Sequence, residues 1–437
     1  MDDIPVEVIG NILSRLGDAK DIVIASVTCR KWREAFRKHL HTLSFDSFNW
    51  PLHKYMTTNG FEINITNTIF QTKGLQRLSL RFHKDYTCSA PSVHAWLLYT
   101  RETLLELRYK VQTKPCVNIL DICGRDKLEV IELAHNPVWL AEPMSQRFPC
   151  LKSLSLRHVR VLSALHLNLL LSACPKIESL ELINPLFSMP DVPKTVEFSS
   201  PTLKSLFVDD VRVDKLIVEA VCLEIFHLKR CALEDFKLIG KGTLKQIKLD
   251  GVSITHLDIS ENIESLEVVD ISNFSIFEEM ISKSLSLRKL RLWNSKVILE
   301  DSDEDEDEDE DLVTDHISTP QLNQYRVDLE TIAVSFPKLS YLCLNYNYGS
   351  LNHNIQGSSY LTNVTVLELG WTVLTDVFSE WVESFLERCP NLKRLVIHGV
   401  IRDAKSQDKC HTLANFTSSM VQLMRSYMHV AVKFEFT

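Results

Sequence analysis

The sequence predicts an α/β solenoid, a curved parallel sheet with helices and turns on its convex side, preceded by three short helices. Two observations lead to this fold class. A short apolar motif recurs along most of the 437 residues, and a helical apolar pattern is confined to the first forty. We therefore expect a helical segment (1–40), a solenoid (41–399), and a C-terminal capping helix and strand (400–437).

The recurring motif has apolar residues at its first, fourth and sixth positions. Its copies begin at Leu40, Leu75, Leu104, Leu128, Leu151, Ile177, Leu203, Leu223, Leu244, Ile263, Leu287, Leu339, Val364 and Leu392. Most of the intervals lie near the 20–29 residues of leucine-rich repeats. Asn136, Cys231 and Asn347 complete the longer signature. Each repeat supplies a strand whose apolar edge only its neighbours can bury, so the pattern predicts a leucine-rich-repeat solenoid.

The segments between the motifs predict the covering elements. Long repeats leave room for helices, as at Phe378–Cys389, where apolar residues share one helical face before Pro390. Between about 203 and 268 the spacing is near twenty residues, which predicts extended or single-turn segments. A helix over Thr417–Met428 and an alternating strand over Val430–Phe436 would close the array, whose last repeat otherwise exposes its core.

The first forty residues predict three short helices. The first helix carries apolar residues at helical spacing, namely Val8, Ile9, Ile12, Leu13 and Leu16. Gly17 supplies its stop, and Asp18 or Asp21 can cap the second helix. The third helix runs through Cys29–Phe36. So short a segment cannot bury enough apolar surface to fold alone, so we expect it to pack on the rest of the chain, on a partner, or on both.

This N-terminal pattern resembles the F-box. The resemblance rests on Ile4-Pro5, the aliphatic pairs that follow, and the run Val27–Trp32 with Cys29 at its centre. Ile4 stands where the F-box usually has Leu, and Gly17 where Pro is common. With the repeats, the chain is similar to plant F-box proteins with irregular leucine-rich repeats. The resemblance implies docking on a Skp-type adaptor through Ile4, Pro5, Val8, Ile9, Ile12, Leu13, Leu16, Val27, Cys29 and Trp32.

The same resemblance implies a function. The chain would be the substrate-recognition subunit of an SCF-type E3 ubiquitin ligase, linked through the adaptor to a cullin and a RING subunit. The repeats would hold an unknown target protein, and the chain would contribute proximity and orientation rather than catalysis. Three alternatives remain. The helices can be an ordinary cap for the repeats. The chain can be an acidic leucine-rich scaffold or chaperone that binds basic proteins outside the ubiquitin pathway, or a hydrolase or small-molecule receptor with a ligand in the concave face.

An acidic run accounts for the net charge of −9. Residues 300–311 are acidic except Ser302, and they fall in the 52-residue interval between Leu287 and Leu339. Like charges at this density repel and bury no apolar area, so we expect a disordered insertion at about 298–318. It can be a solvated spacer or bait for a basic partner, and Ser302 is a candidate phosphorylation site.

Candidates for target binding flank the last apolar positions of the motifs, where side chains point out of the concave sheet. They are Arg77, Arg81, Arg108, Lys110, Arg157, Phe207, Arg291, Trp293 and Tyr341. Each can also be an ordinary solvated side chain. Our hypothesis is that the stretch Arg77–Arg157 meets an acidic or phosphorylated segment, with Trp293 and Tyr341 as apolar anchors.

Several function classes lack their signatures. The sequence has no phosphate loop, zinc-protease or nucleophile-elbow motif, so we expect no catalytic residues and no cofactor. Eleven scattered cysteines without a Cys-x-x-Cys pair predict no metal site and fit a reducing compartment, the nucleus or the cytoplasm. The most apolar run, Val159–Cys174, is interrupted by polar residues, so we expect no membrane span. We also expect no nucleic-acid partner.

Overall fold

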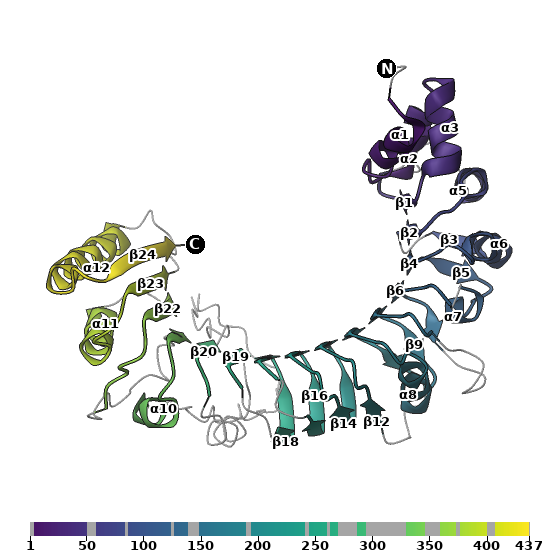
Figure 1. Cartoon of the computed structure of the whole chain (residues 1–437). Helices are drawn as coiled ribbons and strands as arrows, with labels where there is room; N and C mark the ends of the chain where they lie inside the picture. Colours follow the sequence, from purple (N-terminus) through teal and green to yellow (C-terminus); the bar gives the residue numbers. More distant parts are fainter. Residues whose placement is uncertain are drawn as a thin grey trace, which may run out of the picture. The chain divides into compact units, whose positions relative to one another are not determined.

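The computed structural model describes most of the chain (Figure 1). The described residues are 4–49, 58–83, 86–123, 126–138, 148–188, 194–240, 244–259, 263–269, 286–293, 329–345, 359–372, 376–399 and 407–436. They fall into two compact units. Unit 1 comprises Met1–Leu244 and Ser253–Glu261, and unit 2 comprises Lys245–Val252 and Asn262–Thr437.

Unit 1 begins with the three predicted helices. They are α1 (Val6–Leu13), α2 (Ala19–Ser26) and α3 (Arg30–His39). The side chain of Asp18 accepts a hydrogen bond from the backbone N–H of Lys20 at 2.8 Å, which confirms the predicted cap of α2. The first helix ends at Leu13, with Ser14 as its C-cap, so it stops earlier than the predicted stop at Gly17. Gly17 has a φ of +79°, a left-handed conformation that glycine adopts without strain, and lies in the connection to α2.

The main sheet of unit 1 is parallel and follows the order of the motifs. Its strands are β1 (Thr42–Asp46), β2 (Arg77–Arg81), β4 (Glu106–Lys110), β6 (Val130–Ala134), β8 (Ser153–Arg157), β10 (Ser179–Ile183), β13 (Ser205–Asp209) and β15 (Ile225–Lys229). Each pairs with the next so that equivalent motif positions face one another, as Leu78 faces Leu107. The predicted solenoid is therefore present.

The second layer of unit 1 changes along the chain. Its helices are α5 (Thr58–Gln71), α6 (Ala90–Thr100), α7 (Ile119–Ile122) and α8 (Ala164–Ser172), which lie on one side of the main sheet in Figure 1. Two small sheets accompany them. One pairs β3 (Thr87–Ser89) with β5 (Gln112–Lys114), and the other has three strands, with β9 (Arg160–Val161) between β7 (Pro137–Val138) and β11 (Leu186–Phe187). A second sheet then replaces the helices, with β12 (Thr195–Ser199), β14 (Arg212–Glu219), β16 (Ala232–Ile239) and β18 (Ser253–Ile259). The extended segments expected from the twenty-residue spacing are thus confirmed.

Signature residues close the turns after the strands. Asn136 is buried, and its side-chain amide donates to the carbonyl of Ala134 at 2.6 Å. Cys231 is buried, and its thiol donates to the carbonyl of Lys229 at 3.1 Å. These contacts satisfy backbone groups inside the turn, which is why a small polar or thiol side chain suits this position. Asn347 lies outside the described residues.

Unit 2 continues the repeat pattern. Its parallel strands are β17 (Gln246–Asp250), β19 (Ser265–Val269), β20 (Lys289–Trp293), β21 (Tyr341–Asn345), β22 (Val366–Thr372), β23 (Arg394–Gly399) and β24 (Ala431–Phe436). Its helices are α10 (Leu329–Ser335), α11 (Asp376–Arg388) and α12 (Gln407–Ser426). Helix α12 begins ten residues before the predicted start at Thr417. Strand β24 pairs in register with β23, so the predicted final strand adds one more strand to the sheet.

Two further sequence predictions concern the acidic insertion and membrane-spanning segments. The acidic insertion expected at about 298–318, together with Ser302, lies outside the described residues. Among the helices that the structure describes, none is long and apolar enough to cross a membrane.

Tyr109 is a buried exception to the aliphatic pattern. It occupies the last apolar position of the β4 motif and is 1% exposed, and its hydroxyl has no hydrogen-bond partner among the described residues. Burial raises the pKa of this phenol well above its usual value. An unsatisfied buried hydroxyl costs free energy that an apolar ring would not.

Replacing Tyr109 with phenylalanine is therefore expected to stabilise the protein. Chemical denaturation should show a gain of about 1 kcal/mol in the free energy of unfolding of unit 1. Tyr341→Phe is the matched control, because the hydroxyl of Tyr341 does donate to Glu368, and this variant should lose stability. A loss of stability in Tyr109→Phe would mean that its hydroxyl has a partner such as a buried water.

Candidate functional site

An apolar surface lies on the first helices of unit 1. Five large aliphatic side chains here are between 40% and 61% exposed, and we call them the docking face: Val8, Ile12, Leu16, Ile24 and Val27. Val8, Ile12 and Leu16 are spaced four residues apart, so they form one stripe along α1 and the residues that follow it. Exposed aliphatic side chains gathered on one small domain indicate a protein-binding surface.

The structure corrects part of the predicted docking set. Ile9 and Leu13 are 1% and 0% exposed, so they form the core of the three-helix domain instead of facing a partner. They lie on the adjacent stripe of α1, about 100° around the helix from the exposed one. Of the other predicted residues, Pro5 and Cys29 are exposed, and Ile4 and Trp32 are half-buried.

Ile24 was missed as a docking residue by sequence reasoning. It lies on α2 two positions after the buried Ile22, and two positions along a helix point to nearly opposite sides. The side of α2 opposite Ile22 faces away from the core and would ordinarily carry polar residues, so an isoleucine there is the sequence signal for a binding residue.

Helix α1 approaches the end of α3 closely at Gly10. A Cβ atom placed on this glycine would lie 2.4 Å from the Cβ of His39 and 2.6 Å from its backbone oxygen. Contacts this short do not occur between real atoms, so the position excludes every side chain. Near this crossing, Nε2 of His39 lies 3.8 Å from a carboxylate oxygen of Glu7.

The three-helix domain is joined directly to the main sheet of unit 1. Helix α3 ends at His39 and β1 begins at Thr42. The N–H of Lys73 donates to the carbonyl of Arg37 at 2.9 Å, and the N–H groups of Gln76 and Arg77 share the carbonyl of His41, each at 2.9 Å. These backbone bonds fix the docking helices beside β1 and β2 (Figure 1).

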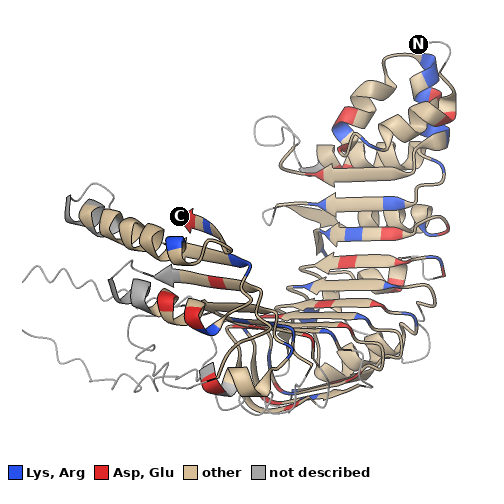
Figure 2. Cartoon of the chain, turned by 60° about the vertical axis from the view of Figure 1, so that its left-hand side comes forward, with Lys and Arg blue, Asp and Glu red and all other residues tan. Residues whose placement is uncertain are grey.

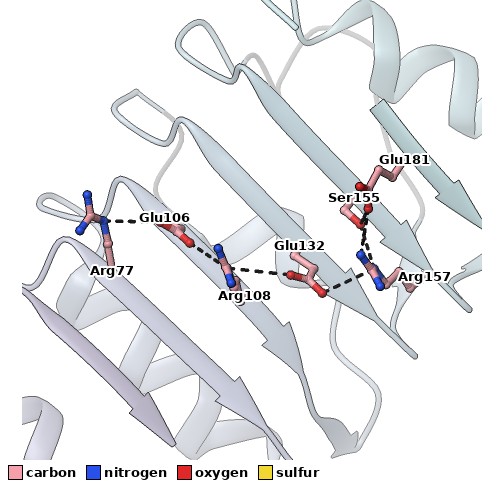
Figure 3. Close-up of polar contacts among 7 residues, drawn as sticks. All are labelled: Arg77, Glu106, Arg108, Glu132, Ser155, Arg157 and Glu181. Carbon is pink, nitrogen blue, oxygen red and sulfur yellow. Dashed lines mark hydrogen bonds and ion pairs between the residues drawn. The ribbon is translucent and has the colours of Figure 1, made fainter. Parts of the chain in front are cut away.

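A second surface is the open face of unit 1, the face of the main sheet opposite its helices. Charged residues recur on its successive strands (Figure 2), and their side chains meet from strand to strand (Figure 3). We call this row the Arg–Glu ladder, and its members are Arg77, Glu106, Arg108, Glu132, Arg157 and Glu181.

Each arginine of the ladder has a carboxylate beside it. Glu106 contacts the Nε atoms of Arg77 and Arg108 at 3.5 and 2.7 Å. Glu132 lies 3.9 Å from the Nε of Arg108 and 3.5 Å from that of Arg157. Arg157 also donates to Glu181 at 2.9 Å, and that carboxylate accepts from Ser155 at 2.8 Å.

Most of the cations predicted to bind an acidic target segment are paired with carboxylates of the same sheet. Arg81 likewise pairs with Asp46 at 3.5 Å, whereas Lys110 is exposed without an ion pair among the described residues. Farther along unit 1, the half-buried Phe207 ring lies 4.7 Å from that of His227. The guanidinium groups predicted to meet an acidic segment therefore already have carboxylate partners within the fold.

Unit 2 has its own open face, where the remaining predicted residues meet. We call these side chains the Trp293 cluster, which comprises Arg291, Trp293, Tyr341, Glu368 and His398. The guanidinium carbon of Arg291 lies 4.9 Å from the centre of the Trp293 ring, and the ring of His398 meets the same indole edge-on at 6.1 Å. The hydroxyl of Tyr341 donates to Glu368, and burial and this hydrogen bond raise the pKa of the phenol.

A glycine makes room for the indole. A Cβ atom on Gly370 would lie 2.7 Å from the Cη2 atom of Trp293. Trp293 therefore reaches from β20 across the neighbouring strand to β22. The structure brings Arg291, Trp293 and Tyr341 into one site, but it places them in a different unit from Arg77, Arg108 and Arg157.

Among the described residues, no three or more His, Cys, Asp or Glu side chains are arranged to hold a metal ion. Burial raises the pKa values of the Cys174, Cys343 and Cys389 thiols to about 12, so these thiols stay protonated at neutral pH.

Comparisons with known proteins match both parts of the chain. Residues 1–43 match a family model described as F-box-like, and residues 105–248 match one described as "FBD-associated F-box protein At5g56370, LRR repeats". Over 442 residues the chain is 55% identical to F-box/LRR-repeat protein At1g67190 of Arabidopsis thaliana, with 100% of each protein covered. The first match coincides with the docking helices and β1, and the second begins at β4.

Proposed function

The chain belongs to the F-box proteins with leucine-rich repeats, and from this premise we propose that it is the substrate-recognition subunit of an SCF-type E3 ubiquitin ligase. The F-box binds a Skp-type adaptor, and the adaptor connects the chain to a cullin and its RING subunit. The repeats bind a target protein and hold it for ubiquitin transfer. The chain itself is a non-catalytic receptor in this proposal.

The observation that carries the proposal is the docking face. Its five aliphatic side chains stay exposed although the neighbouring Ile9 and Leu13 fill the core of the same three helices. Covering such a side chain with a partner contributes about 1 kcal/mol or more, because each still exposes roughly half of its surface. A protein adaptor with an apolar groove would supply that cover.

The short connection to the sheet supports the same role. Only two residues separate α3 from β1, and backbone hydrogen bonds hold both ends of that connection. An adaptor bound to the helices would therefore stand in a fixed orientation to the repeats of unit 1. Orientation of this kind is what a non-catalytic subunit contributes to a transfer reaction.

The proposal is tested by reconstitution. The full chain, co-expressed with a Skp-type adaptor, is expected to co-elute with it in size-exclusion chromatography, and a cullin–RING pair should join only when the adaptor is present. A chain that stays monomeric beside a correctly folded adaptor would contradict the proposal. The alternative role, an acidic scaffold for basic proteins, depends on residues 300–311, which lie outside the described residues.

A further inference from the structure

We propose that the Trp293 cluster on the open face of unit 2 is the anchor site for the target protein. Its occupant is a target segment in which an aromatic or large aliphatic side chain stands next to carboxylates. This inference rests on the proposed function and names the class of target. It moves the recognition of acidic groups from the arginines of unit 1 to those of unit 2.

The apolar part of the site is Trp293. Its indole is partly exposed, and Arg291, Gly370 and His398 hold it in place. A large aromatic ring that is already fixed loses little conformational entropy when a partner covers it. Tryptophan and arginine in contact are also the residue types that dominate binding energy at protein interfaces.

The polar part of the site is the guanidinium of Arg291. Its Nε atom is buried, one Nη atom lies 3.5 Å from Glu267, and the side chain also interacts with the Cys343 thiol. The Arg291 side chain is nevertheless 40% exposed, so part of the guanidinium is open to a partner. A carboxylate is the acceptor that a guanidinium binds most strongly.

The acidic side chains of this face are already occupied. Glu267 lies 3.0 Å from the ammonium group of Lys248 as well as near Arg291. Glu368 accepts from Tyr341, and Glu435 contacts Lys433 and lies 3.1 Å from Nδ1 of His398. Each of these carboxylates therefore already has a partner, and Glu435 also interacts electrostatically with Arg394.

Two exposed cations on the same face make no close ion pair among the described residues. Lys289 on β20 lies opposite Tyr341 on β21. Arg394 on β23 lies opposite Val366 on β22. Both charged side chains are exposed. Lys289 therefore adds a positive charge near Trp293 that no carboxylate among the described residues pairs with. Lys110 is a similar cation on the open face of unit 1, but Lys289 lies on the same strand as the partly exposed Trp293. An acidic segment with a large apolar side chain therefore fits this site.

The test uses the full chain, alone and mixed with a Skp-type adaptor, and a set of short fluorescent peptides. One group has a central Phe or Leu flanked by Asp and Glu. A second group replaces the acids with Asn and Gln, and a third replaces the central residue with Ser. We expect measurable affinity, by fluorescence anisotropy, only for the first group.

Variants then locate the site. Trp293→Ala and Arg291→Gln are expected to weaken binding of the best acidic peptide about tenfold or more. Lys289→Glu and Arg394→Glu change exposed side chains, so they should weaken binding without affecting folding. Arg108→Gln in the Arg–Glu ladder is the matched control and should change affinity less than twofold, which is about 0.4 kcal/mol.

Three results would overturn the inference: equal binding of acidic and neutral peptides, no binding of the acidic group, or a loss in Arg108→Gln as large as that in Arg291→Gln. Adaptor binding, measured on the same preparations, separates this inference from the proposed function. A chain that binds the adaptor but no acidic peptide refutes the anchor site alone, whereas a chain that binds peptide but no adaptor refutes the ligase role.

Discussion

Replacing Ile12 with aspartate is expected to weaken adaptor binding by about 3 kcal/mol, or roughly a hundredfold in affinity. Ile12 lies at the centre of the exposed stripe of α1, between Val8 and Leu16. In the complex a carboxylate at this position would be removed from water without a partner, and the apolar contact would be lost as well. Isothermal titration calorimetry with a purified Skp-type adaptor measures the effect directly.

The fold of the variant should be unchanged, since Ile12 is 40% exposed and its replacement leaves the core intact. Val27→Asp should behave in the same way. Lys38→Ala is the control, because Lys38 contacts only Glu34 on the exposed surface of α3 among the described residues, and its loss should leave adaptor affinity unaltered. An Ile12→Asp chain that binds the adaptor normally would remove the docking face from the interface.

Replacing Gly10 with alanine is the substitution expected to cost most stability. The added methyl group would overlap both the Cβ and the carbonyl oxygen of His39, and a backbone atom cannot move aside as a flexible side chain can. Separating α1 from α3 to make room would disturb the core that contains Ile9 and Leu13. We expect a loss of about 3 kcal/mol in the stability of the three-helix domain.

Gly17→Ala provides a matched comparison in the same domain. Gly17 has a positive φ, but a Cβ atom added to it would meet no other atom within 4 Å, so only backbone strain of about 1 kcal/mol is added. Hydrogen exchange of the α1 and α3 amides reports both effects residue by residue. Similar exchange in the two variants would contradict a steric origin for the larger loss.

The repeat architecture could be predicted because its cause is local and periodic. Each strand is marked by apolar residues such as Leu78 and Leu80, and the interval to the next motif fixes how much chain remains to cover it. The second sheet of unit 1 followed from the same reasoning, since about twenty residues cannot hold a strand, a turn and a full helix.

The Arg–Glu ladder could also have been predicted. Arg108 and Glu132 occupy the same position of successive motifs, and a parallel sheet in constant register places such residues side by side. The outward stripe of α1 was harder to assign. Val8 and Ile9 are neighbours in an unbroken apolar run, and only the packing of α3 decides which of them faces inward.

The Trp293 cluster could be predicted only in part. Its exposed aromatic and cationic residues have a signal in the motif positions, but the contact with Gly370 and His398 does not. Those residues lie far along the chain from Trp293, and β21 lies between their strands and β20. A long side chain that crosses a strand is a product of tertiary packing, which local periodicity does not record.

The two-residue connection between α3 and β1 also has a thermodynamic consequence. In a stacked array each strand is stabilised by its neighbours, so the terminal strand is where unfolding begins most easily. Here that strand is bonded to a domain that itself binds a partner. Any free energy that a ligand contributes to α1, α2 and α3 is therefore shared with β1 and β2, and the occupied chain resists fraying from its N-terminal end more than the empty one.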